Sequence, residues 1–181
     1  MASYLPQIIE SCCRSFIGDQ NSLVREVSLQ VLIKLIDSFT QIEPIINPTK
    51  IMKMLLFEVK SKQPSATVAG SIWHLVGLLH KNYPTVCNYY LEETQKQNLL
   101  LLDEKVRATK PEIKEIIGIM KGLTHSLEVS CKLEVPEIDS LFADLKTFIQ
   151  PLVEVNNRGV MKAGMKLLST HACLFATQIM E

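Results

Sequence analysis

The chain has 181 residues, of which 47% are hydrophobic, and its 19 basic residues balance its 19 acidic residues. This length and composition predict a globular domain with a sizeable core and exclude a disordered tail. A formal net charge of zero argues against a protein that holds nucleic acid by bulk attraction, although local basic patches are compatible with it.

Apolar residues at helical spacing predict four helices in the first half of the chain. They are expected over residues 4–17, 22–39, 48–62 and 65–82. Ser22 and Ser65 are the predicted N-caps of the second and fourth. The main buried stripe of the second helix is expected to be Val24, Val27, Val31, Leu35 and Phe39. Leu32 and Ile36 broaden it, which predicts contact with more than one neighbour. Gly70 and Gly77 fall inside the fourth helix, where close approach of a neighbouring helix would explain them.

The second half of the chain predicts four more helices. The fifth opens at Tyr83-Pro84 and reaches Arg107, unless the polar run 92–98 breaks it. The sixth opens at Lys110-Pro111 and carries the strongest apolar stripe, within residues 112–127, before a connector at 131–135. The seventh begins at Pro136, and the eighth runs from Arg158 to the C-terminus behind a cap at Asn156-Asn157.

The second helix of each successive pair carries a leucine in a similar setting, at Leu35, Leu78, Leu123 and Leu168. A period in the forties with two helices per unit is the signature of HEAT and armadillo arrays. The predicted fold is therefore all-α, a right-handed α-solenoid of about four HEAT-like antiparallel helix pairs in a single array over residues 1–181. The hairpins are expected at 4–39, 48–82, 83–130 and 136–181. The last helix has no polar closing element, which predicts a segment of a longer solenoid or an end that meets a partner.

The search for chemistry finds no nucleotide-binding, hydrolase, metalloprotease or kinase motif. No two of His74, His80, His125 and His171 lie three or four residues apart, so no single helix offers a paired-histidine metal site. His80 and His125 each follow a repeat leucine by two residues, where packing between repeats is expected and a binding strip is the alternative. We therefore expect no catalytic residue, cofactor or metal, and no enzyme activity. Five cysteines without a C-x-x-C pair predict reduced thiols in the cytosol or nucleus. No apolar run approaches the ~18 residues of a membrane span.

Basic residues gather at two of the predicted turns. The turn between the fifth and sixth helices and the turn between the third and fourth supply the candidate nucleic-acid-binding residues. These are Lys105, Arg107, Lys110 and Lys114 at the first turn, and Lys60 and Lys62 at the second. Equivalent turns of a solenoid line one edge, so two basic turns in register would follow a phosphate backbone. The alternative is a solvated loop with cations near helix C-termini, where they are mildly favourable.

Several segments carry a family resemblance in the same order along the chain. They are LPQIIESCCRSF, VREVSLQVLIKLIDSF, LVGLLHKNYP, KPEIKEIIGIMKGLTHSLEVS and AGMKLLSTHACLFATQIM. Together they resemble the N-terminal HEAT-repeat arm of the DNA-dependent protein kinase catalytic subunit, in the PI3K-related kinase family. The resemblance implies a nuclear role in non-homologous end joining, with double-stranded DNA ends, the Ku heterodimer and neighbouring HEAT repeats as partners. The resemblance assigns no catalytic residue to this chain, because the family's kinase domain lies near the far C-terminus and none of its motifs is present here.

Two other functions fit the same helix pattern. A generic HEAT or armadillo adaptor would bind a peptide or helix in its groove, and a cytoplasmic location would suit it. A small helical enzyme or ligand carrier is the third possibility, which the missing motifs disfavour. Salt-dependent binding to duplex ends would favour the DNA-repair function, tight peptide binding the adaptor, and turnover by the isolated chain the enzyme.

Overall fold

The computed structural model describes residues 4–38, 47–132, 147 and 149–180, and over these residues the chain is helical with no strand. The all-α prediction is confirmed. In chain order the helices are α1 (Leu5–Gly18), α2 (Ser22–Ser38), α3 (Pro48–Lys62), α4 (Ala66–Asn82), α5 (Pro84–Cys87), the 3₁₀ helix η2 (Asn88–Tyr90), α6 (Leu91–Val106), α7 (Ile113–Lys132), α9 (Ile149–Glu154) and α10 (Arg158–Met180).

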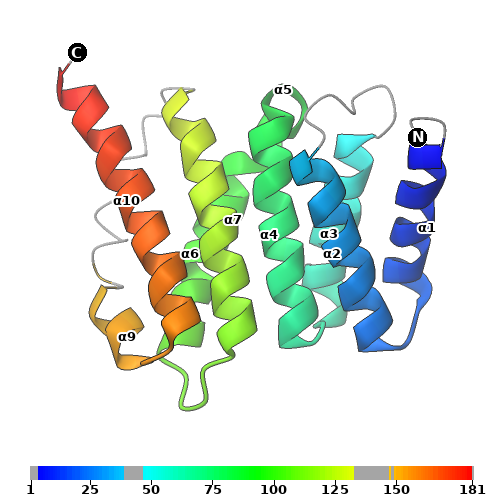
Figure 1. The fold of residues 1–181 in the computed structure, drawn as a ribbon, viewed down its shortest axis with the longest axis horizontal. Coiled ribbons are helices and arrows are strands. Elements are labelled where there is room, and N and C mark those ends of the chain that lie inside the picture. The colour runs from blue at the N-terminus through cyan, green and yellow to red at the C-terminus, as the bar shows by residue number, and fades with distance from the viewer. Residues whose placement is uncertain (1–3, 39–46, 133–146, 148, 181) are drawn as a thin grey trace.

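The helices stack as consecutive hairpins along one axis. Helices α2, α4, α7 and α10 stand side by side, and each contacts the next (Figure 1). Their hairpin partners α1, α3, α6 and α9 contact α2, α4, α7 and α10 respectively. The four leucines that set the sequence period lie one on each helix of the α2–α4–α7–α10 layer. This arrangement confirms the α-solenoid, while its handedness stays a prediction.

One continuous hydrophobic cluster runs through the array from α1 to α10. It is deepest at α4 and α7, where Trp73, Leu78 and Leu123 are at most 1% exposed. The repeat leucines of the outer helices, Leu35 and Leu168, are only half-buried. A solenoid buries a helix by placing a neighbour on each side of it, so the two middle repeats carry most of the core.

Helices α4 and α7 approach each other backbone to backbone. A Cβ added at Gly118 would lie 2.1 Å from the carbonyl oxygen of Gly70, and one added at Gly77 would lie 2.5 Å from that of Gly122. No side chain larger than hydrogen fits at these crossing points. The prediction that a closely approaching helix explains Gly70 and Gly77 is therefore confirmed. Tight packing between the helices offsets the ~1 kcal/mol by which each glycine destabilises a helix.

The predicted main stripe of α2 is wrong at its three valines, whereas Leu32 and Ile36, which were predicted to broaden it, are buried. The buried residues of this helix are Ser28, Leu29, Leu32, Ile33 and Ile36. By contrast, Val24, Val27 and Val31 are 37%, 53% and 36% exposed, and Phe39 lies outside the described residues. Contacts with α1 and α4 bury the other faces of α2 and leave the valine face open.

The fifth predicted helix breaks earlier than expected. Helix α5 gives way to η2 at Asn88–Tyr90, whereas the polar run 92–98 is helical within α6. Polar side chains of that run are buried because other helices supply partners for them. Gln95 Nε2 donates to Ser130 Oγ of α7 at 2.6 Å, and Thr94 Oγ1 lies 2.9 Å from Nε2 of His80 on α4. Amphipathic periodicity alone does not anticipate a buried polar seam of this kind.

The remaining differences concern helix ends. The N-cap of α2 is Asn21 and not Ser22, since Asn21 Oδ1 accepts from the backbone N–H of Leu23 at 2.9 Å. Helix α7 continues through Lys132 into the predicted connector. Asn157 caps α10 as expected, because its Oδ1 accepts from the N–H groups of Gly159 and Val160. Most of the predicted seventh helix, at 136–146 and 148, lies outside the described residues, as do residues 133–135 of the predicted connector.

Candidate functional site

The two basic turns lie at the same edge of the array. The α3–α4 and α6–α7 turns are both at the lower edge in Figure 1, as the repeat equivalence predicted. Lys60 and Lys62 occupy the last turn of α3, and Lys105 the last turn of α6. Arg107 and Lys110 follow directly on the α6–α7 turn. The fold therefore brings these five residues to one edge.

At the α3 end of this edge, both lysines face carboxylates. Lys60 Nζ lies 2.6 Å from Glu93 Oε1 of α6, but both side chains are about half exposed, so the pair contributes little to stability. Lys62 Nζ lies 3.1 Å from Glu58 Oε2, and the Glu58 side chain is 2% exposed. Lys62 therefore balances a buried carboxylate in addition to facing solvent.

At the α6–α7 turn, the cations are only partly available to a ligand. Lys105 Nζ lies 3.5 Å from Glu115 Oε2. Burial raises the pKa of the Glu115 carboxyl, and the Lys105 ammonium offsets part of that rise. Arg107 Nε lies 2.5 Å from Asp103 Oδ1, whereas Lys110 is exposed and forms no ion pair with any described residue. The cations of this turn thus give a weaker field than their number suggests.

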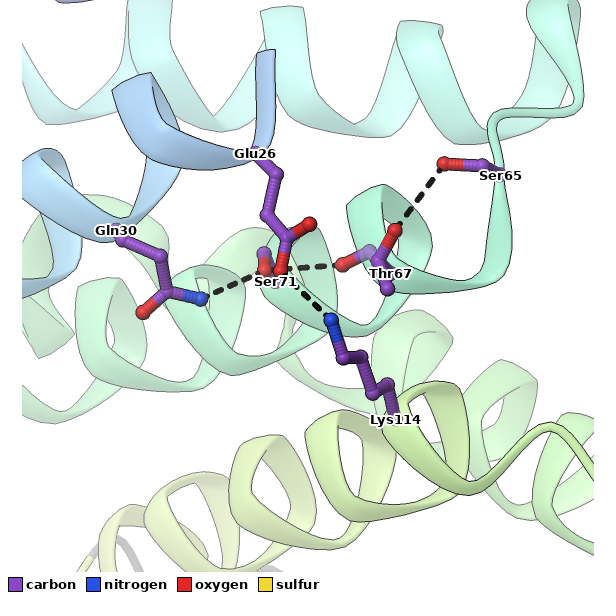
Figure 2. A network of polar contacts seen from close by, with 6 residues as sticks. All are labelled: Glu26, Gln30, Ser65, Thr67, Ser71 and Lys114. Carbon is purple, nitrogen blue, oxygen red and sulfur yellow. Dashed lines mark hydrogen bonds and ion pairs between the residues drawn. The ribbon is translucent and has the colours of Figure 1, made fainter. Parts of the chain in front are cut away.

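Lys114 belongs to a different surface. Its ammonium reaches from α7 past α4 to Glu26 of α2, with Nζ 3.3 Å from Oε1 (Figure 2). Beside this pair, Gln30 Nε2 donates to Ser71 Oγ at 2.9 Å, and Ser71 Oγ donates to the carbonyl oxygen of Thr67 at 3.0 Å. The contacts border a hollow of about 220 Å³ whose lining includes Gly70 and Gly118. The glycine contact that joins α4 to α7 leaves this hollow without side chains to fill it.

Comparison with known proteins agrees with the resemblance seen in the sequence. A family model described as "DNA-PKcs, N-terminal" matches residues 1–181. This chain belongs to the DNA-PKcs N-terminal family. The DNA-dependent protein kinase catalytic subunit of Xenopus laevis is 28% identical to it over 188 residues, which cover 98% of this chain and 4% of that protein. No solved structure matches the chain.

The DNA-PKcs N-terminal chain also has a basic surface that the sequence analysis missed. Lys121 of α7 and Lys162 and Lys166 of α10 line one groove between these helices, together with Thr124 and His125. None of the three lysines forms an ion pair with a described residue. The available signal was the spacing of four residues within α10, which places Lys162 and Lys166 on one face of a helix.

His80 packs in the core, whereas His74 and His125 are partly buried between α4 and α7, so the packing predicted for His80 and His125 is confirmed. The rings of His74 and His125 stack with centroids 5.7 Å apart. Burial, with a contribution from Lys121, lowers the pKa of His74 to about 3, so its ring is neutral. Burial likewise lowers the pKa of His80 to about 4, and His80 is 1% exposed. The side chain of His171 lies outside the described part of the chain.

Acidification is expected to destabilise the fold through His80. The unfolded chain protonates this histidine below a pKa of about 6.5, whereas the folded chain resists protonation down to about 4. The free energy of unfolding should therefore fall as the pH drops through that window. Urea midpoints at about pH 7 and about pH 5 measure the loss, and His80→Gln should reduce it. An equal pH dependence in wild type and His80→Gln would contradict this role.

The described residues give no support for a reactive thiol, a metal site or a membrane span. Cys12, Cys13 and Cys87 are free thiols, and burial raises the pKa of Cys13 and Cys87 to about 11, which keeps both protonated. Within the same ranges no cluster of three His, Cys, Asp or Glu side chains is placed to hold a metal ion. None of the described helices has the length and hydropathy to cross a bilayer.

Proposed function

We propose that this chain is a non-catalytic HEAT-repeat scaffold segment of a DNA-dependent protein kinase catalytic subunit. It contributes to docking of DNA ends and of the Ku heterodimer in double-strand-break repair by non-homologous end joining, in the nucleus. The whole-chain match to the DNA-PKcs N-terminal family supports the parent protein. The shared edge of two basic turns is the observation that supports a contact with DNA.

The proposed mechanism is mechanical and electrostatic. Stacked hairpins hold successive turns in fixed positions, so cations on neighbouring turns meet phosphates of one duplex without a folding cost. Asp103, Glu93 and Glu115 partly neutralise these cations, which makes the contact weak and salt-dependent. The exposed valine face of α2 fits contact with a neighbouring hairpin of the parent solenoid.

Reversing two charges at the α6–α7 turn should weaken binding to duplex DNA. We expect Arg107→Glu with Lys110→Glu to lower the affinity about tenfold at low salt and to reduce its salt dependence. Lys105 is left unchanged in this variant, because a glutamate there would face the buried Glu115 and destabilise the fold. Fluorescence anisotropy with a labelled blunt duplex measures the affinity, and circular dichroism checks the helical content.

A matched control carries the same charge change away from the edge. Lys50 and Lys53 lie on α3 away from its turn with α4, are exposed, and form no ion pair with a described residue. Lys50→Glu with Lys53→Glu should bind DNA much more nearly like wild type. Equal losses in both double variants would indicate a net-charge effect and would remove the proposed DNA edge.

The contact with Ku needs a separate measurement. We expect the chain to bind duplex ends loaded with purified Ku heterodimer more tightly than bare ends, because a second contact raises the effective concentration. The same labelled duplex with and without Ku tests this in one titration. Equal affinity for both substrates would restrict the proposed role to DNA.

The groove between α7 and α10 favours one alternative function. A HEAT or armadillo adaptor binds a protein partner in such a groove, and it would act equally well in the cytoplasm. Binding to a protein segment with no measurable affinity for duplex DNA would favour the adaptor over the DNA-repair scaffold.

A further inference from the structure

We propose that the groove between α7 and α10 binds an acidic amphipathic helix of a partner protein. The groove, here called the α7–α10 groove, is rimmed by Lys121, Lys162 and Lys166 and floored by Ile117, Gly159 and Ala163. This site lies on the faces of two helices and not on the turns at the basic edge. It is therefore independent of the DNA contact proposed above.

The two walls of the groove are regular. Helices α7 and α10 contact each other along the array. Lys121 and His125 are four residues apart on α7, and Lys162 and Lys166 are four apart on α10. Residues at this spacing share one helix face, so each wall presents a row of basic or imidazole groups. Two such rows along neighbouring helices suit a rod-shaped ligand that lies between them.

The charge of the groove is not balanced within the described chain. No carboxylate lines it, and its three lysines form no ion pair there. The nearby Glu128 lies 3.2 Å from Lys81 on α4 and 3.9 Å from His125, so it is already engaged. The cations at the basic edge differ in this respect, because all except Lys110 face a carboxylate. Unbalanced cations around a concavity favour an acidic partner.

The floor distinguishes a protein partner from nucleic acid. Gly159 and Ala163 lie four residues apart on α10 and line the hollow together with Ile117. The hollow measures about 370 Å³, near the lower end of the range of about 300–1,000 Å³ for ligand pockets. A phosphate backbone gains nothing from an apolar floor, whereas the apolar face of an amphipathic helix buries surface there. Acidic residues on the flanks of that helix would meet the lysines of the rim.

The test uses the whole chain and a fluorescein-labelled synthetic helix of leucine and glutamate, with glutamates on one face. A matched peptide with lysine in place of glutamate serves as the ligand control. We expect only the acidic peptide to bind. Lys121→Glu with Lys162→Glu should lower its affinity by about tenfold or more. Lys50→Glu with Lys53→Glu changes the net charge equally and should have a much smaller effect.

A substitution at the apolar floor tests whether the hollow itself contributes to binding. Ala163→Phe would fill the hollow without changing the charge, so it should also weaken binding of the acidic peptide. Lys166→Glu replaces an exposed side chain and provides a second rim variant if circular dichroism shows that another variant is misfolded. Arg107→Glu with Lys110→Glu should leave peptide binding intact, which separates this site from the DNA edge.

Three outcomes would overturn the proposal. The first is no binding of the acidic peptide by the wild-type chain. The second is equal binding of the acidic and basic peptides. The third is displacement of the peptide by a blunt duplex that binds the Ala163→Phe variant normally and does not bind the rim variants. That result would make the groove a phosphate-binding site.

Discussion

Gly118→Leu is expected to destabilise the fold by about 3 kcal/mol or more, the largest effect of any single substitution proposed for this chain. A Cβ at this position would lie 2.1 Å from the carbonyl oxygen of Gly70, and other backbone atoms of Gly70 lie within 2.4 Å of it. Backbone atoms cannot rotate away as side chains do. Helices α4 and α7 would have to separate, which would open the most buried part of the core.

Urea unfolding followed by circular dichroism measures this loss. Gly18→Ala is the control for replacing a helical glycine without a clash, because an added Cβ at the exposed end of α1 meets nothing within 4 Å. We expect that control to change stability by less than about 1 kcal/mol. Gly164→Ala provides an intermediate case, since its Cβ would meet Leu152 Cδ1 at an ordinary 3.4 Å. A Gly118→Leu variant as stable as Gly18→Ala would show that α4 and α7 do not pack backbone to backbone.

The glycines also show how far the sequence predicts the fold. Periodicity located α4 and α7, and the cost of Gly70 and Gly77 in a helix indicated a close neighbour. The sequence did not identify Gly118 and Gly122 as the facing residues, because local periodicity carries no information on the register between two helices. That register is set by tertiary packing across the α4–α7 interface.

The α2 stripe was mispredicted for a related reason. Apolar spacing marks Val24, Val27 and Val31 as one helix face, but it does not say whether a neighbour covers that face. Contacts with α1 and α4 bury Leu29 and Ile33 instead, next to Leu32 and Ile36, which the sequence did predict. The repeat leucines follow the same rule, since Leu78 and Leu123 in the middle are buried more completely than Leu35 and Leu168 towards the ends.

The sequence predicted where the basic residues of the candidate site lie, but it did not predict which carboxylates pair with them. Repeat equivalence placed Lys60 and Arg107 on neighbouring turns of one edge. The carboxylates that pair with such cations often come from distant sequence, as Glu93 does for Lys60 and Glu26 does for Lys114. Pairing across hairpins depends on the stacking of the array, so counting lysines at a turn overestimates the charge that a ligand meets.

Arg25→Met is expected to destabilise the fold by about 3 kcal/mol, because it removes the main partner of a buried carboxylate. Arg25 joins three helices. Its guanidinium pairs with Glu58 of α3, its Nε donates to the carbonyl oxygen of Phe16 of α1 at 2.9 Å, and it stacks over the Phe16 ring. The Glu58 side chain is 2% exposed, so Lys62 alone would have to balance its charge.

The double variant Arg25→Met with Glu58→Leu should regain most of that loss, because it removes both charges and fills the space with apolar groups. Arg14→Met is the control, since the Arg14 and Glu10 side chains are 79% and 63% exposed and their pair should contribute less than about 1 kcal/mol. Urea midpoints of the two single variants and the double variant complete the thermodynamic cycle. If the losses of Arg25→Met and Glu58→Leu simply add in the double variant, the two residues are not coupled. The contacts of Arg25 with Phe16 would then account for its contribution, and the α2–α3 link would depend on apolar packing alone.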